Sequence, residues 1–170
     1  MRYLADTNIL ARFVDKRHPH SSVARAALKT LAYEEYTLYV TSQNVIELWN
    51  VITRPADKNG LGRTPTEAYR ILRLVERFFV VLPDTPQIYQ EWRRLVIEYQ
   101  VSGVQVHDAR LVAAMRVHGV SHILTFNGKD FARYRREGIV AVAPDDDAIV
   151  RRVRENMERY QTATEKPADS

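Results

Sequence analysis

Acidic side chains stand near the ends of several predicted strands in this chain. Asp6 directly follows the first apolar run, Glu47 lies about one helical turn beyond the second, and Asp108 opens a predicted helix. Asp130 follows a later apolar run, with Asn127 between the run and the acid. Because ligands bind outside the carboxyl ends of the strands in open parallel sheets, we expect these four carboxylates to meet at one edge of the sheet.

A cluster of carboxylates has an electrostatic cost that a bound cation relieves. Two like charges about 4 Å apart repel by about 1 kcal/mol in water and by about 4 kcal/mol at an effective dielectric constant of about 20. Mg²⁺ and Mn²⁺ are the cations that best suit oxygen ligands of this kind. One such ion activates a water molecule and polarises a phosphoryl oxygen, and two ions clamp the attacking and leaving oxygens of a phosphodiester. The acids therefore predict metal-assisted phosphodiester hydrolysis.

Each acid also has a purely structural explanation. Asp6 can cap the helix that follows it, and Asp108 can be the N-cap or a first-turn acid of its own helix. Glu47 can be a solvated helix residue, although apolar residues flank it, and Asp130 can close a turn. Taken one at a time, these structural roles are the simpler explanations, but the joint placement of the acids at strand ends favours a metal site.

Short apolar runs alternate with helical patterns along the whole chain. The predicted strands cover residues 3–5, 37–41, 79–82, 122–126 and 139–142. The predicted helices cover residues 7–14, 21–33, 42–52, 66–78, 87–99 and 108–118. The strands are continuously apolar, as in strands that are covered on both faces, and their alternation with helices implies right-handed crossovers. The sequence therefore predicts an α/β fold, a three-layer α/β/α sandwich with a mainly parallel sheet.

The composition is that of an ordinary globular protein. Of the 170 residues, 45% are apolar and 27% are charged, which excludes a low-complexity or disordered chain. No apolar run approaches the roughly 20 residues that cross a bilayer, and an acid at position six fits no signal peptide, so we expect neither feature. The absence of cysteine excludes disulfides, thiolate zinc sites and cysteine nucleophiles, and it fits the cytoplasm. The net charge of +4 is compatible with a nucleic-acid partner and equally with an ordinary solvated surface.

The chain is expected to have two parts, a main domain over residues 1–144 and a C-terminal helical extension with a frayed tail over residues 145–170. The extension begins near Asp145 as a helix with a possible cap. Its apolar face consists of Ile149, Val150 and Val153. The segment over residues 162–167 is polar, and we expect it to be frayed.

Four motifs, in this order along the chain, resemble the motifs of PIN domains. They are LADTNIL at residues 4–10, SQNVIELW at 42–49 followed by Thr53-Arg54-Pro55, HDARLVAA at 107–114, and ILTFNGKDF at 123–131. The similarity covers residues 1–144. One such motif would be weak evidence, but four in the same order, each in a compatible strand or helix setting, are specific.

The resemblance implies a PIN-type ribonuclease, most similar to the VapC toxins of type II toxin–antitoxin modules. In that family an acidic cluster binds Mg²⁺ or Mn²⁺ and cleaves RNA, an antitoxin protein occludes the acidic pocket, and homodimers are frequent. Carried over to this sequence, Asp6, Glu47 and Asp108 are the core acids and Asp130 is the fourth. Some members have an aspartate where this chain has Asn127, and an amide binds a metal more weakly than a carboxylate does. Whether one ion or two are bound therefore stays open.

Other polar residues are candidates for supporting roles. Asn8, Ser42 and Thr125 can orient the carboxylates through hydrogen bonds, or can equally serve as helix caps and strand-packing residues. The resemblance makes Asn127 a supporting polar group.

Cationic and aromatic residues near the acids have two interpretations each. Arg110 and Arg116 lie on the helix that Asp108 opens, where they can hold RNA phosphates or form a solvated helix face. Trp49 and Trp92 fit apolar helix faces, and they predict core packing rather than stacking against bases.

Two rival functions keep the same type of fold. The first is a non-catalytic PIN-like module that binds RNA or docks a partner without a competent metal site, and Asn127 is the feature that favours it. The second is a phosphotransfer enzyme or receiver domain with an aspartyl nucleophile. The segment Asp6-Thr7-Asn8 lacks the paired aspartates of such enzymes, so this function ranks last.

Overall fold

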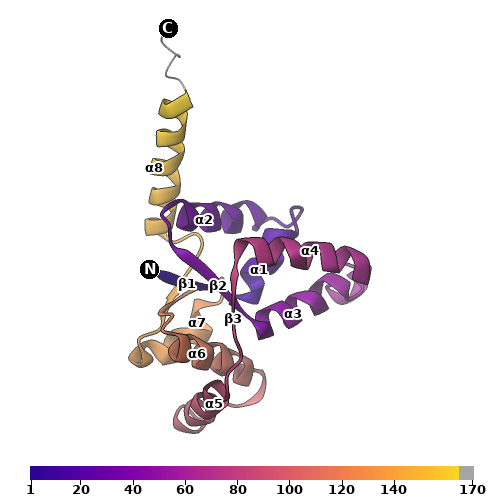
Figure 1. Cartoon of the computed structure of the whole chain (residues 1–170), viewed down its shortest axis with the longest axis vertical. Helices are drawn as coiled ribbons and strands as arrows, with labels where there is room; N and C mark the ends of the chain where they lie inside the picture. Colours follow the sequence, from indigo (N-terminus) through magenta and orange to yellow (C-terminus); the bar gives the residue numbers. More distant parts are fainter. Residues whose placement is uncertain (165–170) are drawn as a thin grey trace.

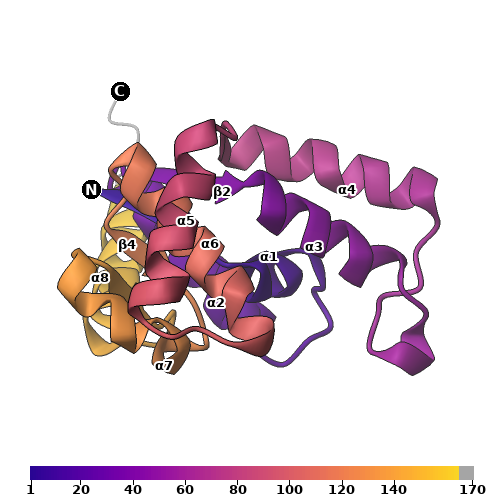
Figure 2. The same ribbon diagram turned by 90° about the horizontal axis from the view of Figure 1, so that it is seen from below.

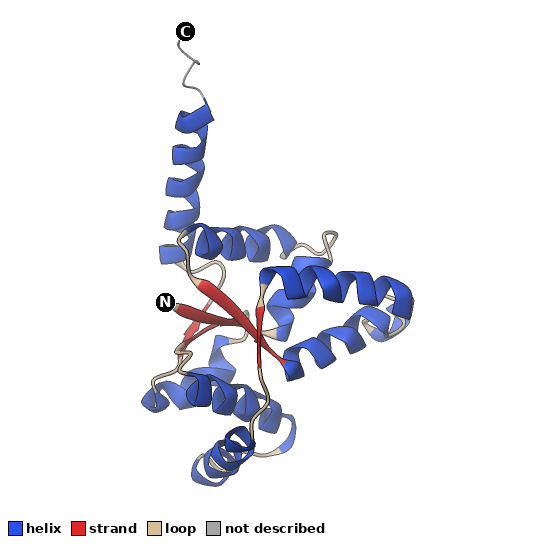
Figure 3. Ribbon diagram, in the orientation of Figure 1, coloured by secondary structure: helices blue, strands red, loops and turns tan. Residues whose placement is uncertain are grey.

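One parallel sheet forms the centre of the molecule (Figure 3). The computed structural model describes residues 1–164, and the side chains as far as residue 158. Within these residues the strands are β1 (Arg2–Ala5), β2 (Thr37–Thr41), β3 (Val80–Leu82), β4 (His122–Leu124) and β5 (Val140–Val142). Their spatial order is β3-β2-β1-β4-β5, and all four neighbouring pairs are parallel. The strand order reverses direction between β1 and β4, which is the kind of switch point where such sheets bind ligands.

Helices cover both faces of the sheet, so the predicted three-layer α/β/α fold is confirmed (Figure 1). The helices are α1 (Thr7–Val14), α2 (Ser21–Tyr33), α3 (Ser42–Thr53), α4 (Pro65–Phe78), α5 (Pro86–Glu98), α6 (Val106–His118), α7 (Gly128–Phe131) and α8 (Asp147–Thr164). Helices α1 to α4 lie on one face of the sheet, and α5 to α7 lie on the other.

Each face of the sheet has its own hydrophobic core. Tyr3 and Ala5 of β1 lie in the core beneath α1 to α4, whereas Leu4 between them lies in the core beneath α5 and α6. This alternation is the two-residue period of a strand, and it explains why the strands are apolar on both faces. Trp49 packs against the first core and Trp92 against the second, as predicted.

All the predicted strands and the predicted helices up to residue 118 begin and end within two residues of the observed bounds. The two largest differences are informative. The helix predicted from Asp108 begins at Val106, so Asp108 lies in its first turn. The strand predicted to reach Phe126 ends at Leu124, because the backbone N–H of Phe126 donates to the Asn8 side chain at 3.2 Å. Helix α7 was not predicted, since one helical turn is too short to show a periodic pattern.

Residues 57–63 fold back closely on the end of α3. The backbone N–H of Leu61 donates to the carbonyl of Val51 at 2.9 Å. A Cβ atom at Gly60 would lie 1.9 Å from the carbonyl oxygen of Arg54, so only glycine fits this position. These residues therefore connect α3 to α4 along a path that their own backbone contacts fix.

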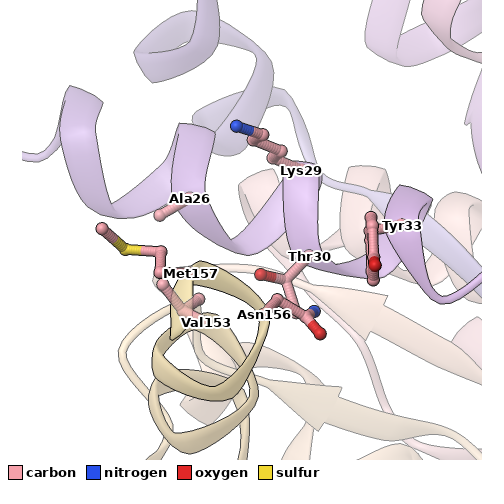
Figure 4. Close-up of a pocket in the computed structure, with 7 residues that line it drawn as sticks. All are labelled: Ala26, Lys29, Thr30, Tyr33, Val153, Asn156 and Met157. Atoms are coloured by element: carbon pink, nitrogen blue, oxygen red, sulfur yellow. The ribbon is translucent and has the colours of Figure 1, made fainter. Parts of the chain in front are cut away.

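Helix α8 rests on α2 and then projects from the body of the molecule (Figure 1). Ile149 at its start is buried in the first core, and Arg152 lies 3.3 Å from Glu34 at the end of α2. Between the two helices lies a groove of about 270 Å³ (Figure 4). The helical extension is present, and the division of the chain at residue 144 stays a prediction. Of the predicted frayed segment, residues 162–164 are helical and residues 165–167 lie outside the described residues.

The helices offer no candidate for a membrane crossing. Within residues 1–164, none combines the required length with sufficient apolar character.

Candidate active site

Asp6 stands where β1 passes into α1, and three hydrogen bonds hold its carboxylate. Oδ1 accepts from the backbone N–H of Thr7 at 2.7 Å, which makes Asp6 the N-cap of α1. Oδ2 accepts from Nδ2 of Asn8 at 2.8 Å and from Oγ1 of Thr125 at 2.7 Å. The structural explanation for Asp6 is therefore correct, but two donors beyond the cap also fix the orientation of the carboxylate.

Burial has the largest effect on the acidity of Asp6. Only 8% of the residue is exposed, and this desolvation raises the pKa of its carboxyl above the ordinary value. The bonds from Thr125 and Thr7 oppose the rise in pKa. The negative charges of Glu47 and Asp130 add to it. Asp6 thus interacts electrostatically with two acids that are remote in sequence.

Glu47 is held from both sides by hydroxyl and amide donors. Its Oε2 accepts from Oγ1 of Thr7 at 2.6 Å, and its Oε1 accepts from Nε2 of Gln43 at 2.8 Å. Nδ2 of Asn44 donates to the same Thr7 hydroxyl at 3.1 Å. Asn44 also closes a capping box with Thr41, which fixes the start of α3 directly beyond β2. The start of the helix and the position of Glu47 therefore depend on the same polar residues.

Asp108 is the acid whose pKa is most clearly perturbed. The residue is half-buried in the first turn of α6, and its pKa rises from the ordinary value of 3.8 to about 6. Burial is the largest cause, followed by the negative charge of Asp130. Asp6 and Glu47 contribute in the same direction, and only the neighbouring His107 opposes them. This pattern means that the four predicted acids share one region at the carboxyl edge of the sheet.

Asp130 lies in α7, where its backbone N–H donates to the carbonyl of Asn127 at 3.0 Å. Within residues 1–164, no hydrogen bond reaches the carboxylate of Asp130 or of Asp108. Among the described residues, their oxygens therefore meet no protein donor, whereas the oxygens of Asp6 and Glu47 each accept at least one hydrogen bond.

A family model described as the PIN domain matches residues 3–137, which is most of the chain. The chain belongs to the PIN domain family. No curated protein matches it in sequence.

Solved structures share the fold of this PIN domain at low identity. VapBC2 from Rickettsia felis, bound to promoter DNA, matches with a TM-score of 0.61 and 14% identity, over 84% of this chain and 98% of the other. VapC20 from Mycobacterium tuberculosis, described as a toxin that cleaves the sarcin-ricin loop, matches with a TM-score of 0.58 and 19% identity, over 82% and 98%. PAE2754 from Pyrobaculum aerophilum matches with a TM-score of 0.56 and 21% identity, over 89% and 95%. At these identities the likeness establishes the fold.

The residues predicted to support the acids of this PIN domain have different surroundings. Asn8 donates to Asp6 and, at 3.1 Å, to Thr125, so it links the end of β1 to the end of β4. Ser42 instead donates to Oδ2 of Asp84 at 2.5 Å, a carboxylate outside the predicted four. Asn127 is exposed, and within residues 1–164 no hydrogen bond involves its side chain.

Several polar residues at the site were not predicted. Thr7 and Gln43 hold Glu47, and Asp84 pairs with Arg110 at 2.8 Å. Gln43 could have been found from its i, i+4 spacing to Glu47 on one helix face. The Thr7 and Asp84 contacts join segments far apart in sequence, so no local pattern indicates them.

The oxygen donors of this PIN domain suit a hard divalent cation. Within residues 1–164, however, no group of three or more acidic or histidine side chains is gathered closely enough to hold an ion directly. Mg²⁺ usually keeps several water ligands and binds through one or two carboxylates. The arrangement therefore fits a largely hydrated ion rather than an ion enclosed by protein ligands.

Proposed function

We propose that this PIN domain is an endoribonuclease that depends on Mg²⁺ or Mn²⁺ and hydrolyses RNA phosphodiester bonds. We further propose that it acts in the cytoplasm as the toxin of a VapBC-type toxin–antitoxin pair. The observation that carries the first proposal is the convergence of four acids from separate segments, since the charges of Asp130, Asp6 and Glu47 all act on Asp108. The second is supported by the shared fold with VapBC2 and with VapC20.

In this proposal Asp6, Glu47, Asp108 and Asp130 hold one or two ions. A divalent ion at these oxygens lowers the pKa of an attacking water and polarises the phosphoryl oxygen of the scissile bond.

The residues around two of these acids keep the carboxylates in one orientation. Thr125 and Asn8 hold Asp6 through Oδ2, and Thr7 and Gln43 hold Glu47 through both oxygens. Because these donors are in place before any ligand arrives, little conformational freedom is lost on binding.

Partner proteins are also part of the proposal. The similar structures include VapBC-1 of nontypeable Haemophilus influenzae and FitAB bound to a DNA fragment. By analogy we propose that an antitoxin protein covers the acidic edge of the sheet and that the chain forms homodimers.

Cleavage of a mixed pool of tRNA, rRNA and mRNA by the purified full chain tests the activity. Discrete products are expected with Mn²⁺ or Mg²⁺ and not with EDTA. The Asp108→Asn protein, which keeps the side-chain shape, should be folded and inactive. Equal cleavage by this variant would assign the activity to a contaminating nuclease and refute the proposed site.

A non-catalytic RNA-binding or partner-docking module is the second candidate. The absence of three gathered acids within residues 1–164 favours it, as does the amide at Asn127. In that case the chain binds RNA without cutting any member of the pool at millimolar Mn²⁺.

A further inference from the structure

A cavity of about 270 Å³ opens beside the acidic edge of the sheet. It is formed by the segment that joins β3 to α5, by α5 itself and by α6. Helices α5 and α6 pack side by side (Figures 1 and 2). The lining residues are Asp84, Thr85, Ile88, Tyr89, Trp92 and Arg110. None of them is among the acids or the supporting residues of the proposed metal site.

Hydrogen bonds connect the wall of this cavity to Glu47. Arg110 donates through Nη2 to Asp84 at 2.8 Å and through Nη1 to Oε1 of Gln43 at 3.3 Å. Nε2 of the same Gln43 side chain donates to Glu47 at 2.8 Å. A group bound in the cavity would therefore lie within two hydrogen bonds of a proposed metal ligand.

One wall of the cavity is aromatic. Tyr89 is 62% exposed, although it is a large aromatic residue, and its ring centroid lies 5.9 Å from that of Trp92 at an interplanar angle of 30°. The indole N–H of Trp92 donates to the carbonyl of Val106 at 3.0 Å, so its polar atom is already satisfied. Such ring faces suit a flat aromatic ligand, because stacking needs no particular hydrogen-bond pattern.

One further lining residue has a polar atom without a partner within residues 1–164. Thr85 is the N-cap residue of α5, but its hydroxyl makes no capping bond. Its Oγ1 is buried and has no hydrogen-bond partner among the described residues, which costs free energy. Arg110 keeps further N–H donors beyond the two that it uses, and Asp84 offers an acceptor beside them. A cationic and an anionic side chain thus line the cavity together with the aromatic residues.

We infer that this cavity binds one nucleobase of the RNA, close to the bond that is cut. The inference rests on the proposed function and adds a subsite to it. Trp92 packs against the core as predicted, and it also lines this cavity. A nucleobase fits better than a protein side chain, because the aromatic wall is combined with a cation and because the hydrogen bonds lead to Glu47.

Binding of an RNA oligonucleotide is measured first in EDTA, which withholds the ions that the proposed cleavage requires. The Trp49→Phe background leaves Trp92 as the fluorescent reporter. RNA should change the Trp92 emission, and Tyr89→Ala should raise the Kd by about 5- to 100-fold. Tyr69→Ala is the matched control, since Tyr69 is also exposed but does not line the cavity, and its Kd should match that of the parent protein.

An abasic nucleotide, placed at each position in turn, identifies the base that is bound. At one position it should weaken binding by the parent protein and cause no further loss in Tyr89→Ala. Cleavable RNA with Mn²⁺ should show the same position next to the cut, with a lower kcat/KM for Tyr89→Ala.

Three outcomes separate the subsite from the proposed function. Equal Kd values for Tyr89→Ala and the parent, with no effect of an abasic nucleotide at any position, would overturn the inference even if RNA is cleaved. Tyr89-dependent binding without cleavage in Mn²⁺ would support the subsite and refute the nuclease. If no RNA changes the Trp92 emission, the inference is also overturned. A protein partner would then be the expected ligand of the cavity.

Discussion

Replacement of Asp108 by asparagine should stabilise the metal-free protein at neutral pH. The pKa of Asp108 rises from 3.8 to about 6. Two pKa units correspond to a free-energy cost of about 3 kcal/mol for the charged form in the folded protein. Because the side chain is only half-buried, solvent screening reduces this figure to about 1 to 1.5 kcal/mol. Asparagine keeps the shape and removes the charge, and within residues 1–164 no hydrogen bond to the carboxylate is lost. The free energy of unfolding of Asp108→Asn should therefore exceed that of the parent by this amount.

The pH dependence of this gain has a definite sign. Between about pH 4 and pH 6, Asp108 is more protonated in the folded chain than in the unfolded chain, so the stability of the parent falls as the pH rises through this range. The variant does not titrate at this position. Its advantage should be complete above about pH 6 and absent below about pH 4.

Urea unfolding followed by far-UV circular dichroism, in EDTA at pH 7.5 and at pH 4, measures the difference. Asp57→Asn is the control, because Asp57 lies exposed in a short 3-10 helix over Ala56–Lys58, and the free energy of unfolding should change by less than about 0.5 kcal/mol. Adding Mn²⁺ at pH 7.5 should reduce the difference in free energy of unfolding between Asp108→Asn and the parent, because the ion stabilises only the parent, whose site is intact. A variant that is no more stable at pH 7.5, or whose advantage persists at pH 4, would refute the idea that burial and the neighbouring acids together disfavour the charge of Asp108.

Three further predictions concern metal, a supporting hydroxyl and a remote ion pair. Saturating Mn²⁺ should raise the Tm of the parent protein and not that of Asp6→Asn, with reversal by EDTA; an equal shift in both by differential scanning fluorimetry would place the ion elsewhere. Thr125→Val should lower the free energy of unfolding by about 1 to 3 kcal/mol and slow RNA cleavage at least tenfold, because Asp6 loses a donor; unchanged cleavage rates would show that this hydroxyl does not position the carboxylate. Glu137 lies 2.7 Å from both Arg94 and Arg116, which lower its pKa, so this stabilisation should be present above about pH 4.5 and lost as the pH falls. Glu137→Gln should accordingly cost about 2 kcal/mol at pH 7 and less as the pH falls below about 4.5 in urea unfolding, while cleavage stays normal.

Local patterns in the sequence were sufficient to predict most of the helices and strands. The helical period over residues 21–33 and the apolar run over residues 37–41 predicted α2 and β2 with their observed bounds. Turns of three to six residues, such as α7, were missed because they are shorter than the period that reveals a helix. The start of α6 was placed two residues late, since Asp108 has the residue type of an N-cap but lies inside the first turn.

The candidate site was only partly accessible from the sequence. The four acids could be named because strands that alternate with helices bring their carboxyl ends to one edge. Ser42 could be named as a donor to a carboxylate, but its acceptor is Asp84, 42 residues away. Such pairings depend on how the loops beyond neighbouring strands meet.

The sequence by itself determined which chemical groups this protein carries and which elements hold them. Caps, apolar periods and acids at strand ends are local features, so they can be read without the fold. Only the tertiary structure decided the acidity of Asp108, the donors that hold Glu47 and the cavity beside Arg110. The physical reason is that burial and charge–charge interactions depend on distances between segments remote in sequence, and chain folding alone sets those distances.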